Sequence, residues 1–214
     1  MGKKELGRIL TVLDNKYKIK IERMKPFDIL VHGILSTRTK DETTFPAQYR
    51  LLKIANTPRK LSKLDTSVVK KLIYPVSFYK TKAKLLKKTA NMLLDDFNGK
   101  VPSSKEKLLK LPGVGPKVAS LVQVWGFGVA AIPVDTHVNR ISQRLGIVPK
   151  GNKPEDTQIV LESILKPSQR MIANHVLVTF GKDICRPTAP QCYRCPVYQY
   201  CKFERKEYYK NRVL

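Results

Sequence analysis

A break between two helical stretches, at residues 111–117, constrains the fold more than any other feature of the sequence. It reads Leu-Pro-Gly-Val-Gly-Pro-Lys and follows a leucine- and lysine-rich helical run over residues 103–111. Gly113 and Gly115 permit backbone conformations that a Cβ would forbid, and Pro116 suits the first turn of a new helix. The sequence therefore predicts a helix, a tight glycine turn and a second helix, whose first N–H groups form a surface suited to an anion such as a phosphate.

Lys117 lies one residue into that second helix. An amine at this position is a candidate nucleophile. The same position also suits a solvated lysine after a structural turn, because lysines occur along the whole chain. The local sequence leaves both interpretations open.

Helical periodicity extends over most of the chain. The segments expected to be helical are 3–16, 26–35, 41–54, 62–73, 80–97, 103–111, 116–124, 135–145, 155–165 and 169–180. Convincing period-2 alternation, which would indicate strands, is absent. We therefore expect an all-α protein, with its best domain boundary near residues 126–133 and the N-terminal helix returning to pack on the later half.

The charge balance is strongly basic, with 41 Lys and Arg against 17 Asp and Glu and a formal net charge of +24. Such an excess implies a polyanionic partner, and nucleic acid is the leading candidate. A generally basic proteome is the alternative. An acidic membrane surface fits less well, because the lysines are not confined to one amphipathic segment. With no bilayer-length apolar run and no signal-like N-terminus, we expect a cytoplasmic protein and no membrane partner.

All four cysteines fall within 17 residues near the end of the chain. A reducing compartment makes disulfides less favoured than metal. Structural zinc sites usually pair two Cys-x-x-Cys turns, and this segment contains one, so the spacing favours an iron–sulfur cubane held by four separate thiolates, with zinc as the alternative. The four are Cys185, Cys192, Cys195 and Cys201.

Three of these features together resemble endonuclease III, of the helix–hairpin–helix DNA glycosylase superfamily. They are the 111–117 turn, the Val134-Asp-Thr-His137 segment and the cysteine spacing. The similarity runs over nearly the whole chain. It implies two helical lobes flanking a DNA-binding cleft: a six-helix lobe with the helix–hairpin–helix over residues 22–129, and an iron–sulfur cluster lobe formed by residues 1–21 and 130–214.

The resemblance also implies an activity. The family members are bifunctional DNA glycosylases and abasic-site (β-elimination) lyases that remove oxidised pyrimidines from duplex DNA in base excision repair. Lys117 occupies the position of their nucleophile, which attacks the sugar C1′, and Asp135 that of their essential carboxylate. Standing alone, Asp135 would also be an apt helix N-cap, and the two roles are compatible. The cofactor implied is a 4Fe-4S cluster held by the four cysteines.

Several further residues are expected to contact DNA. Arg38 stands where bacterial relatives carry a glutamine that fills the gap left by the flipped base, and Phe78 is a plausible second wedge, because an apolar side chain can replace lost stacking. The remaining candidates are Leu111, Gly113, Val114 and Gly115 of the hairpin and Arg186 of the first cysteine loop.

Two other functions are weighed against this one. The first is a mismatch-specific thymine or uracil DNA glycosylase, but that branch usually carries a residue other than lysine where Lys117 stands. The second is a non-catalytic module that binds damaged DNA. We expect the partner to be double-stranded DNA containing damaged bases or abasic sites. We expect a monomer in a prokaryotic cytoplasm, associated with the nucleoid through its DNA.

Overall fold

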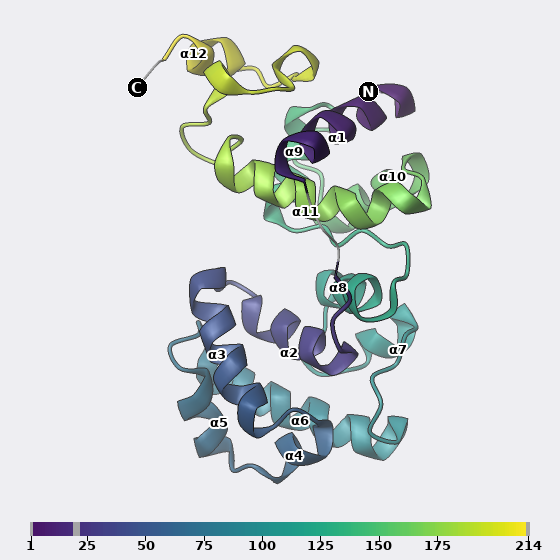
Figure 1. The fold of residues 1–214 in the computed structure, drawn as a ribbon, viewed down its shortest axis with the longest axis vertical. Helices are drawn as coiled ribbons and strands as arrows, with labels where there is room; N and C mark the ends of the chain where they lie inside the picture. Colours follow the sequence, from purple (N-terminus) through teal and green to yellow (C-terminus); the bar gives the residue numbers. More distant parts are fainter. Residues whose placement is uncertain (1, 19–21, 213–214) are drawn as a thin grey trace. The chain divides into compact units, whose positions relative to one another are not determined.

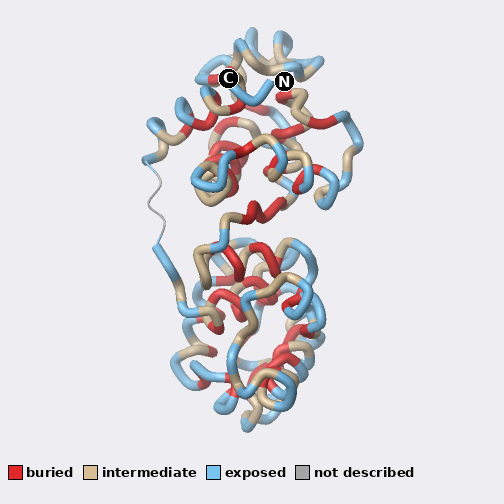
Figure 2. Tube along the Cα trace, turned by 90° about the vertical axis from the view of Figure 1, so that its right-hand side faces the viewer, coloured by how far each residue is buried: buried red, intermediate tan, exposed pale blue. Residues whose placement is uncertain are grey.

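The computed structural model describes residues 2–18 and 22–212. Within these ranges it contains twelve α-helices, two short 3₁₀ helices and no strand, so the all-α class is confirmed (Figure 1). The chain divides into two compact units, Glu22–Val129 and Met1–Ile21 with Ala130–Leu214. Each unit buries an apolar cluster of its own (Figure 2). No helix in the described part of the chain has the length and apolar character needed to cross a bilayer.

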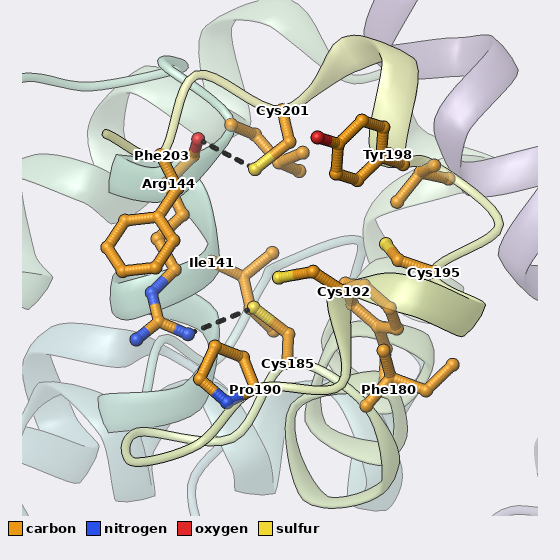
Figure 3. Close-up of a pocket in the computed structure, with 13 residues that line it drawn as sticks. Ile141, Arg144, Phe180, Cys185, Pro190, Cys192, Cys195, Tyr198, Cys201 and Phe203 are labelled. Atoms are coloured by element: carbon orange, nitrogen blue, oxygen red, sulfur yellow. Dashed lines mark hydrogen bonds between the residues drawn. The ribbon is translucent and has the colours of Figure 1, made fainter. Parts of the chain in front are cut away.

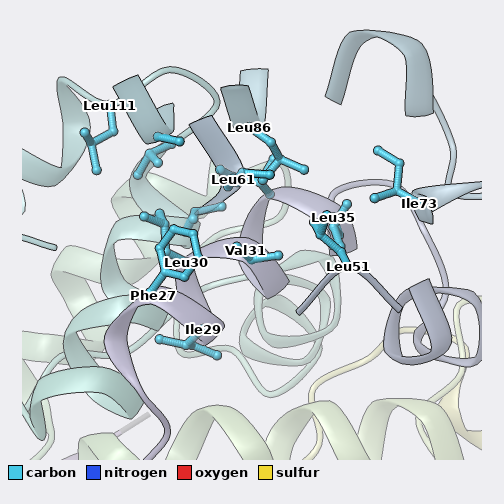
Figure 4. Close-up of a cluster of buried hydrophobic side chains, with 14 of the residues drawn as sticks. Phe27, Ile29, Leu30, Val31, Leu35, Leu51, Leu61, Ile73, Leu86 and Leu111 are labelled. Atoms are coloured by element: carbon cyan, nitrogen blue, oxygen red, sulfur yellow. The ribbon is translucent and has the colours of Figure 1, made fainter. Parts of the chain in front are cut away.

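The unit of residues 22–129 is built around one apolar helix, α2. Its segments Ile29–Val31 and Ile34–Leu35 are buried, and the helix packs against α8, α3 and α6. Figure 4 shows Leu30, Val31 and Leu35 among side chains from the surrounding helices. The helices of this unit are α2 (Pro26–Ser36), α3 (Asp41–Ile54), α4 (Pro58–Lys63), α5 (Thr66–Ile73), α6 (Tyr79–Phe97), α7 (Lys105–Leu109) and α8 (Pro116–Phe127).

Gly33 lies where α2 and α8 approach most closely. A Cβ built on Gly33 would lie 2.6 Å from Cγ1 of Val118, a separation that no real pair of carbon atoms tolerates. Valine has few χ1 alternatives in a helix, so its methyl group cannot easily move aside. Glycine therefore lets the backbone of α2 pack directly against the first turn of α8.

The other unit gathers α1 with the last part of the chain. Leu6, Ile9, Leu10 and Leu13 form one buried stripe on α1, which packs against α11. The Tyr17 hydroxyl donates to Oδ2 of Asp183 at 2.9 Å, at the C-terminal end of α11. The helices of this unit are α1 (Lys3–Tyr17), α9 (Thr136–Arg144), α10 (Pro154–Ile164), α11 (Pro167–Asp183), the 3₁₀ helices η1 (Cys192–Arg194) and η2 (Tyr198–Tyr200), and α12 (Lys206–Lys210).

The prediction of one continuous helix over residues 62–73 is wrong. The sequence favours a single helix over residues 62–73, but the chain leaves the helical conformation at Leu64 and Asp65, between α4 and α5. The ammonium of Lys87 in α6 donates to the carbonyls of Ser62 and Leu64 and so satisfies groups that the break exposes. Other differences are at helix ends, where α7 is shorter than predicted and α8 and α11 are longer. Helix α12 is one that the sequence does not predict.

The contact between Gly33 and Val118 gives a test of the α2–α8 packing. Gly33→Ala should lower the free energy of unfolding by about 1–3 kcal/mol through overpacking, although alanine gains about 1 kcal/mol in helix propensity. In a Val118→Ala background the same substitution should cost less, because the clashing methyl groups are gone. Urea unfolding of the four proteins measures this coupling, and an equal cost in both backgrounds would contradict it.

Candidate functional site

The 111–117 hairpin is held from beneath by apolar side chains. Leu111 and Val114 are only 2% and 7% exposed and reach the same core as α2. Gly113 has φ 81°, a conformation that favours glycine, and a Cβ there would lie 3.3 Å from Cδ1 of Leu85. The Thr89 hydroxyl donates to the carbonyl of Pro112 at 2.6 Å. The turn is therefore rigid, with its glycine backbone exposed.

Burial changes what the predicted hairpin contacts can be. Leu111 and Val114 direct their side chains into the core, so they can offer a ligand only backbone groups. Gly113 and Gly115 are exposed and can be approached closely. Helix α8 begins after Gly115 without a side-chain cap, which leaves the first N–H groups of the helix, those of Lys117 and Val118, without an intrahelical partner. The arrangement suits an anion.

Lys117 is half-buried in the first turn of α8, beside those N–H groups. Pro116 precedes it at the first helical position, where the missing N–H of proline costs nothing. The following residue, Val118, is 4% exposed and packs against Gly33. The helix end that carries the amine is thus fixed by the core directly behind it.

Asp135 uses one oxygen to cap α9. Its Oδ1 accepts hydrogen bonds from the N–H groups of His137 and Val138, each at 2.9 Å, so the expected N-cap is confirmed. Its Oδ2 has no hydrogen-bonding partner among residues 2–18 and 22–212. The half-buried carboxylate therefore holds the helix and still keeps one oxygen for another group.

Arg140 anchors the first turns of α9, and the sequence did not single it out. Its Nη2 donates to the carbonyls of Cys185 at 2.8 Å and Gly181 at 3.1 Å, and lies 3.1 Å from Nδ1 of His137. A Cβ on Gly181 would lie 2.9 Å from the same Nδ1. Burial lowers the pKa of His137, although the negative charge of Asp135 opposes this. The only signal in the sequence is that Arg140 lies on the same helix as Asp135.

The four cysteines surround one shared space (Figure 3). Apolar side chains line the rest of the pocket, among them Ile141, Phe180 and Val197. The guanidinium of Arg144 donates to Sγ of Cys185 at 3.4 Å, and the same guanidinium stacks on Phe203 with 4.3 Å to the ring centre. Every cysteine thus lines a pocket whose walls are mostly apolar.

The four thiols fit a multi-atom group such as a metal–sulfur cluster. In the described part of the chain no three Cys, His, Asp or Glu side chains are grouped closely enough to hold one metal ion. Four separate thiolates around a common space are what a cubane cluster requires. Burial raises the pKa of Cys192 to about 11 and of Cys195 to about 12, so binding such a group would release protons.

Arg38 and Phe78 lie side by side although 40 positions separate them in the sequence. The centre of the Arg38 guanidinium is 6.0 Å from the centre of the Phe78 ring. Both residues have positive φ, 53° and 58°, which is uncommon outside glycine. Phe78 is 62% exposed, a large value for an apolar side chain.

The predicted contact residue Arg186 is exposed but partly engaged. Its Nε donates to the carbonyls of Lys182 and Asp183, at 3.3 and 3.1 Å, at the end of α11. Its own carbonyl accepts from Arg144 at 2.7 Å. Only the remaining N–H groups of its guanidinium are left for a ligand.

Comparison with known proteins gives the family. Residues 31–167, more than half of the chain, match the family described as HhH-GPD superfamily base excision DNA repair protein. Endonuclease III of Thermotoga maritima is 40% identical over 181 residues, which cover 85% of this chain and 84% of that protein. The chain belongs to the endonuclease III family of this superfamily.

Other members of the endonuclease III family are similar over as much of the chain or more. The chloroplastic endonuclease III homolog 1 of Arabidopsis thaliana is 41% identical over 190 residues, and the matched region spans 85% of this chain but only 50% of that longer protein. A solved endonuclease III, trapped as a covalent intermediate with DNA, is 30% identical with a TM-score of 0.90, covering 97% of this chain and 99% of its own.

The cap at Asp135 predicts a stability difference between two substitutions. Asp135→Ala should lower the free energy of unfolding by about 1 kcal/mol, because two N–H groups lose their acceptor, whereas Asp135→Asn should cost only a few tenths, since asparagine caps equally well. Chemical unfolding measures both. The exposed Asp156, in the first turn of α10, provides the control Asp156→Asn, and equal losses for Asp135→Ala and Asp135→Asn would contradict the capping role.

Proposed function

We propose that this protein is a bifunctional DNA glycosylase and abasic-site lyase that removes oxidised pyrimidines from duplex DNA in base excision repair. The observation that carries the proposal is Lys117: a half-buried amine in the first turn of α8, directly after a rigid hairpin with exposed glycine backbone. Membership of the endonuclease III family supports it, as does the relative trapped as a covalent intermediate with DNA.

In this proposal the hairpin binds the DNA backbone. The N–H groups of Lys117 and Val118, the exposed Gly113 and Gly115 and the positive end of α8 would together hold a phosphate. The net charge of +24 would attract the protein to duplex DNA. In a prokaryote, it would therefore associate with the nucleoid. Damaged and abasic duplexes are the proposed partners.

Lys117 would carry the covalent step. Its uncharged amine attacks C1′ of the flipped nucleotide, a C–N bond forms, the glycosidic bond breaks, and the base leaves with a proton. Opening of the sugar ring gives a Schiff base. Loss of a proton from C2′ then expels the 3′ phosphate by breaking the C3′–O bond, and water finally hydrolyses the imine and frees the lysine.

Asp135 would assist through the oxygen that the cap does not use. A carboxylate Oδ2 with no protein partner among the described residues can stabilise positive charge that develops at the sugar and can help to move protons there. Because Oδ1 is fixed by two N–H groups, the free oxygen is held in one orientation.

The cofactor we propose is a 4Fe-4S cluster held by Cys185, Cys192, Cys195 and Cys201. Its support is the donor set, four thiols around one mostly apolar pocket. When bound, such a cluster would cross-link the segment from η1 to η2 to the end of α11. Its proposed role is to hold that segment in shape.

Borohydride trapping tests Lys117 directly, because it reduces a Schiff base to a stable bond. We expect trapping on duplexes with a single thymine glycol and on plain abasic duplexes, and its complete loss in Lys117→Ala with DNA binding nearly intact. Lys71→Ala, on the exposed side of α5, is the matched control. Unchanged trapping by Lys117→Ala would refute the assignment. Trapping on the abasic duplex alone would support the lyase activity but leave open which base the enzyme removes. A duplex with a T·G mismatch tests the alternative function, a mismatch-specific glycosylase.

Metal analysis tests the cofactor. Protein prepared without oxygen should be yellow-brown and contain about four irons per chain, the content of an intact cubane. Replacing any one of the four cysteines by serine should lower the iron content and the visible absorbance, because a ligand is lost. One zinc per chain with no iron would overturn the cluster in favour of the single-ion alternative.

A further inference from the structure

Lys82 is a cation buried in the side of α6 that packs against the core. It is 5% exposed and lies beside the buried Ala83 and Leu86. Burying a charge is costly unless its hydrogen-bonding capacity is filled. The ammonium has three donors, and all three are used: Leu35 O at 2.7 Å, Thr37 O at 2.6 Å and Thr39 Oγ1 at 3.1 Å. Burial lowers the pKa of Lys82 to about 8, so the ammonium is still the main form at pH 7.

One acceptor, the Leu35 carbonyl, belongs to the last turn of α2, and the other two belong to the loop that follows this helix. Carbonyls at a helix end lack intrahelical partners, and a cation is favourable there. Hydroxyls of the same loop complete the bonding: Ser36 and Thr37 both donate to the carbonyl of Gly33 at 3.2 Å. The N–H of Thr39 donates to Ser36 O at 3.1 Å. Residues 36–39 are thus fixed on both sides of Arg38, whose side chain is exposed.

Lys82 is also hydrogen-bonded to Phe78. Its backbone N–H donates to the Phe78 carbonyl at 2.9 Å, in the first turn of α6. One residue therefore contacts both exposed, left-handed positions: Phe78 through its main chain and the neighbours of Arg38 through its side chain. Backbone in sparsely populated regions persists only where surrounding contacts hold it, and such residues cluster at functional sites. Here a single residue, Lys82, makes hydrogen bonds to the backbone at Phe78 and to the residues on both sides of Arg38.

We propose that Lys82 is a positioning residue that keeps Arg38 beside Phe78, so that both side chains enter the duplex together where a nucleotide has been flipped out. This inference rests on the proposed function, because it assigns the pair to a gap in DNA. Ordering a loop at the moment of binding costs conformational entropy, and a loop held in advance avoids that cost. Lys82 would thereby strengthen binding to lesion DNA without touching it.

Helix α6 supplies a matched control. Lys87, one turn further along, donates its ammonium to the carbonyls of Ser62 and Leu64 in the α4–α5 break. Lys87→Met and Lys82→Met both remove a cation that satisfies loop carbonyls, but only Lys82 holds the loop of Arg38. Lys82→Arg keeps the charge and several donors and should retain most of the function.

A first experiment measures, without DNA, how accessible the loop containing Arg38 is to a protease. Limited trypsin digestion of the full chain, followed by mass spectrometry, compares the rates of cleavage after Arg38 and after Lys63. We expect Lys82→Met to speed cleavage after Arg38 roughly tenfold by loosening the loop, with little change after Lys63, and Lys87→Met to do the reverse. Equal rates after Arg38 in both variants would overturn the positioning role, whatever the enzyme's activity.

The second experiment compares binding to a duplex carrying a stable abasic-site analogue with binding to the same undamaged duplex. The ratio of the two dissociation constants cancels the general effect of charge. We expect Lys82→Met and Arg38→Ala each to lower the preference for the abasic duplex about fivefold, and the double variant to lower it no further. Lys87→Met should leave the preference unchanged.

The outcomes separate the two proposals. An additive double variant, or an equal loss in Lys87→Met, would overturn the role of Lys82. No preference for the abasic duplex in the unaltered protein would instead refute the proposed function, and the digestion would still decide what Lys82 holds. Where Lys82→Met does not fold, Thr39→Val removes one of its three acceptors, and the same changes are expected at smaller size.

Discussion

The packing of α2 against α8 is the constraint on which the candidate site depends. The backbone of α2 approaches the first turn of α8 at Gly33, where Val118 leaves no room for a side chain. Because Val118 follows Lys117 directly, the contact that fixes α8 in the core also fixes the amine at its surface. Leu111 and Val114 anchor the hairpin in the same core. The exposed glycine backbone therefore keeps its shape and remains available to a ligand.

Along α9 and at its N-cap, side chains that stabilise the local structure also lie at the candidate carboxylate site or contact the cysteine segment. The two carboxylate oxygens of Asp135 differ in their contacts. Oδ1 caps the helix, and Oδ2 has no hydrogen-bonding partner within the described ranges. Arg140 and Arg144, one turn apart, donate to Cys185, through its carbonyl and its sulfur respectively. Helix α9 thus connects the free carboxylate oxygen to the segment that bears the cysteines.

Residues with local signals could be predicted from the sequence, and residues whose role depends on distant segments could not. Prolines and glycines marked the start of α8, and the motif spacing singled out Lys117, Asp135 and the cysteines. The break at Leu64 carries only a weak local signal, Asp65 at the N-cap of α5, and its exposed carbonyls are satisfied by Lys87 from another helix. Lys82 and Arg140 were missed for the same reason: their acceptors lie 41 to 47 positions away in the sequence.

The same distinction changes how the net charge is understood. A formal charge of +24 suggests a surface covered with phosphate-binding groups. Several of these cations, however, are directed at the protein itself: Lys82 and Lys87 at the ends of helices, Arg140 at the carbonyl of Cys185, and Arg170 at the carbonyls of Ala130 and Leu165. Cations that hold loops in place contribute to the long-range attraction of DNA but displace no counterions from it. The salt dependence of binding reports the phosphates contacted, so it should be far shallower than the net charge implies.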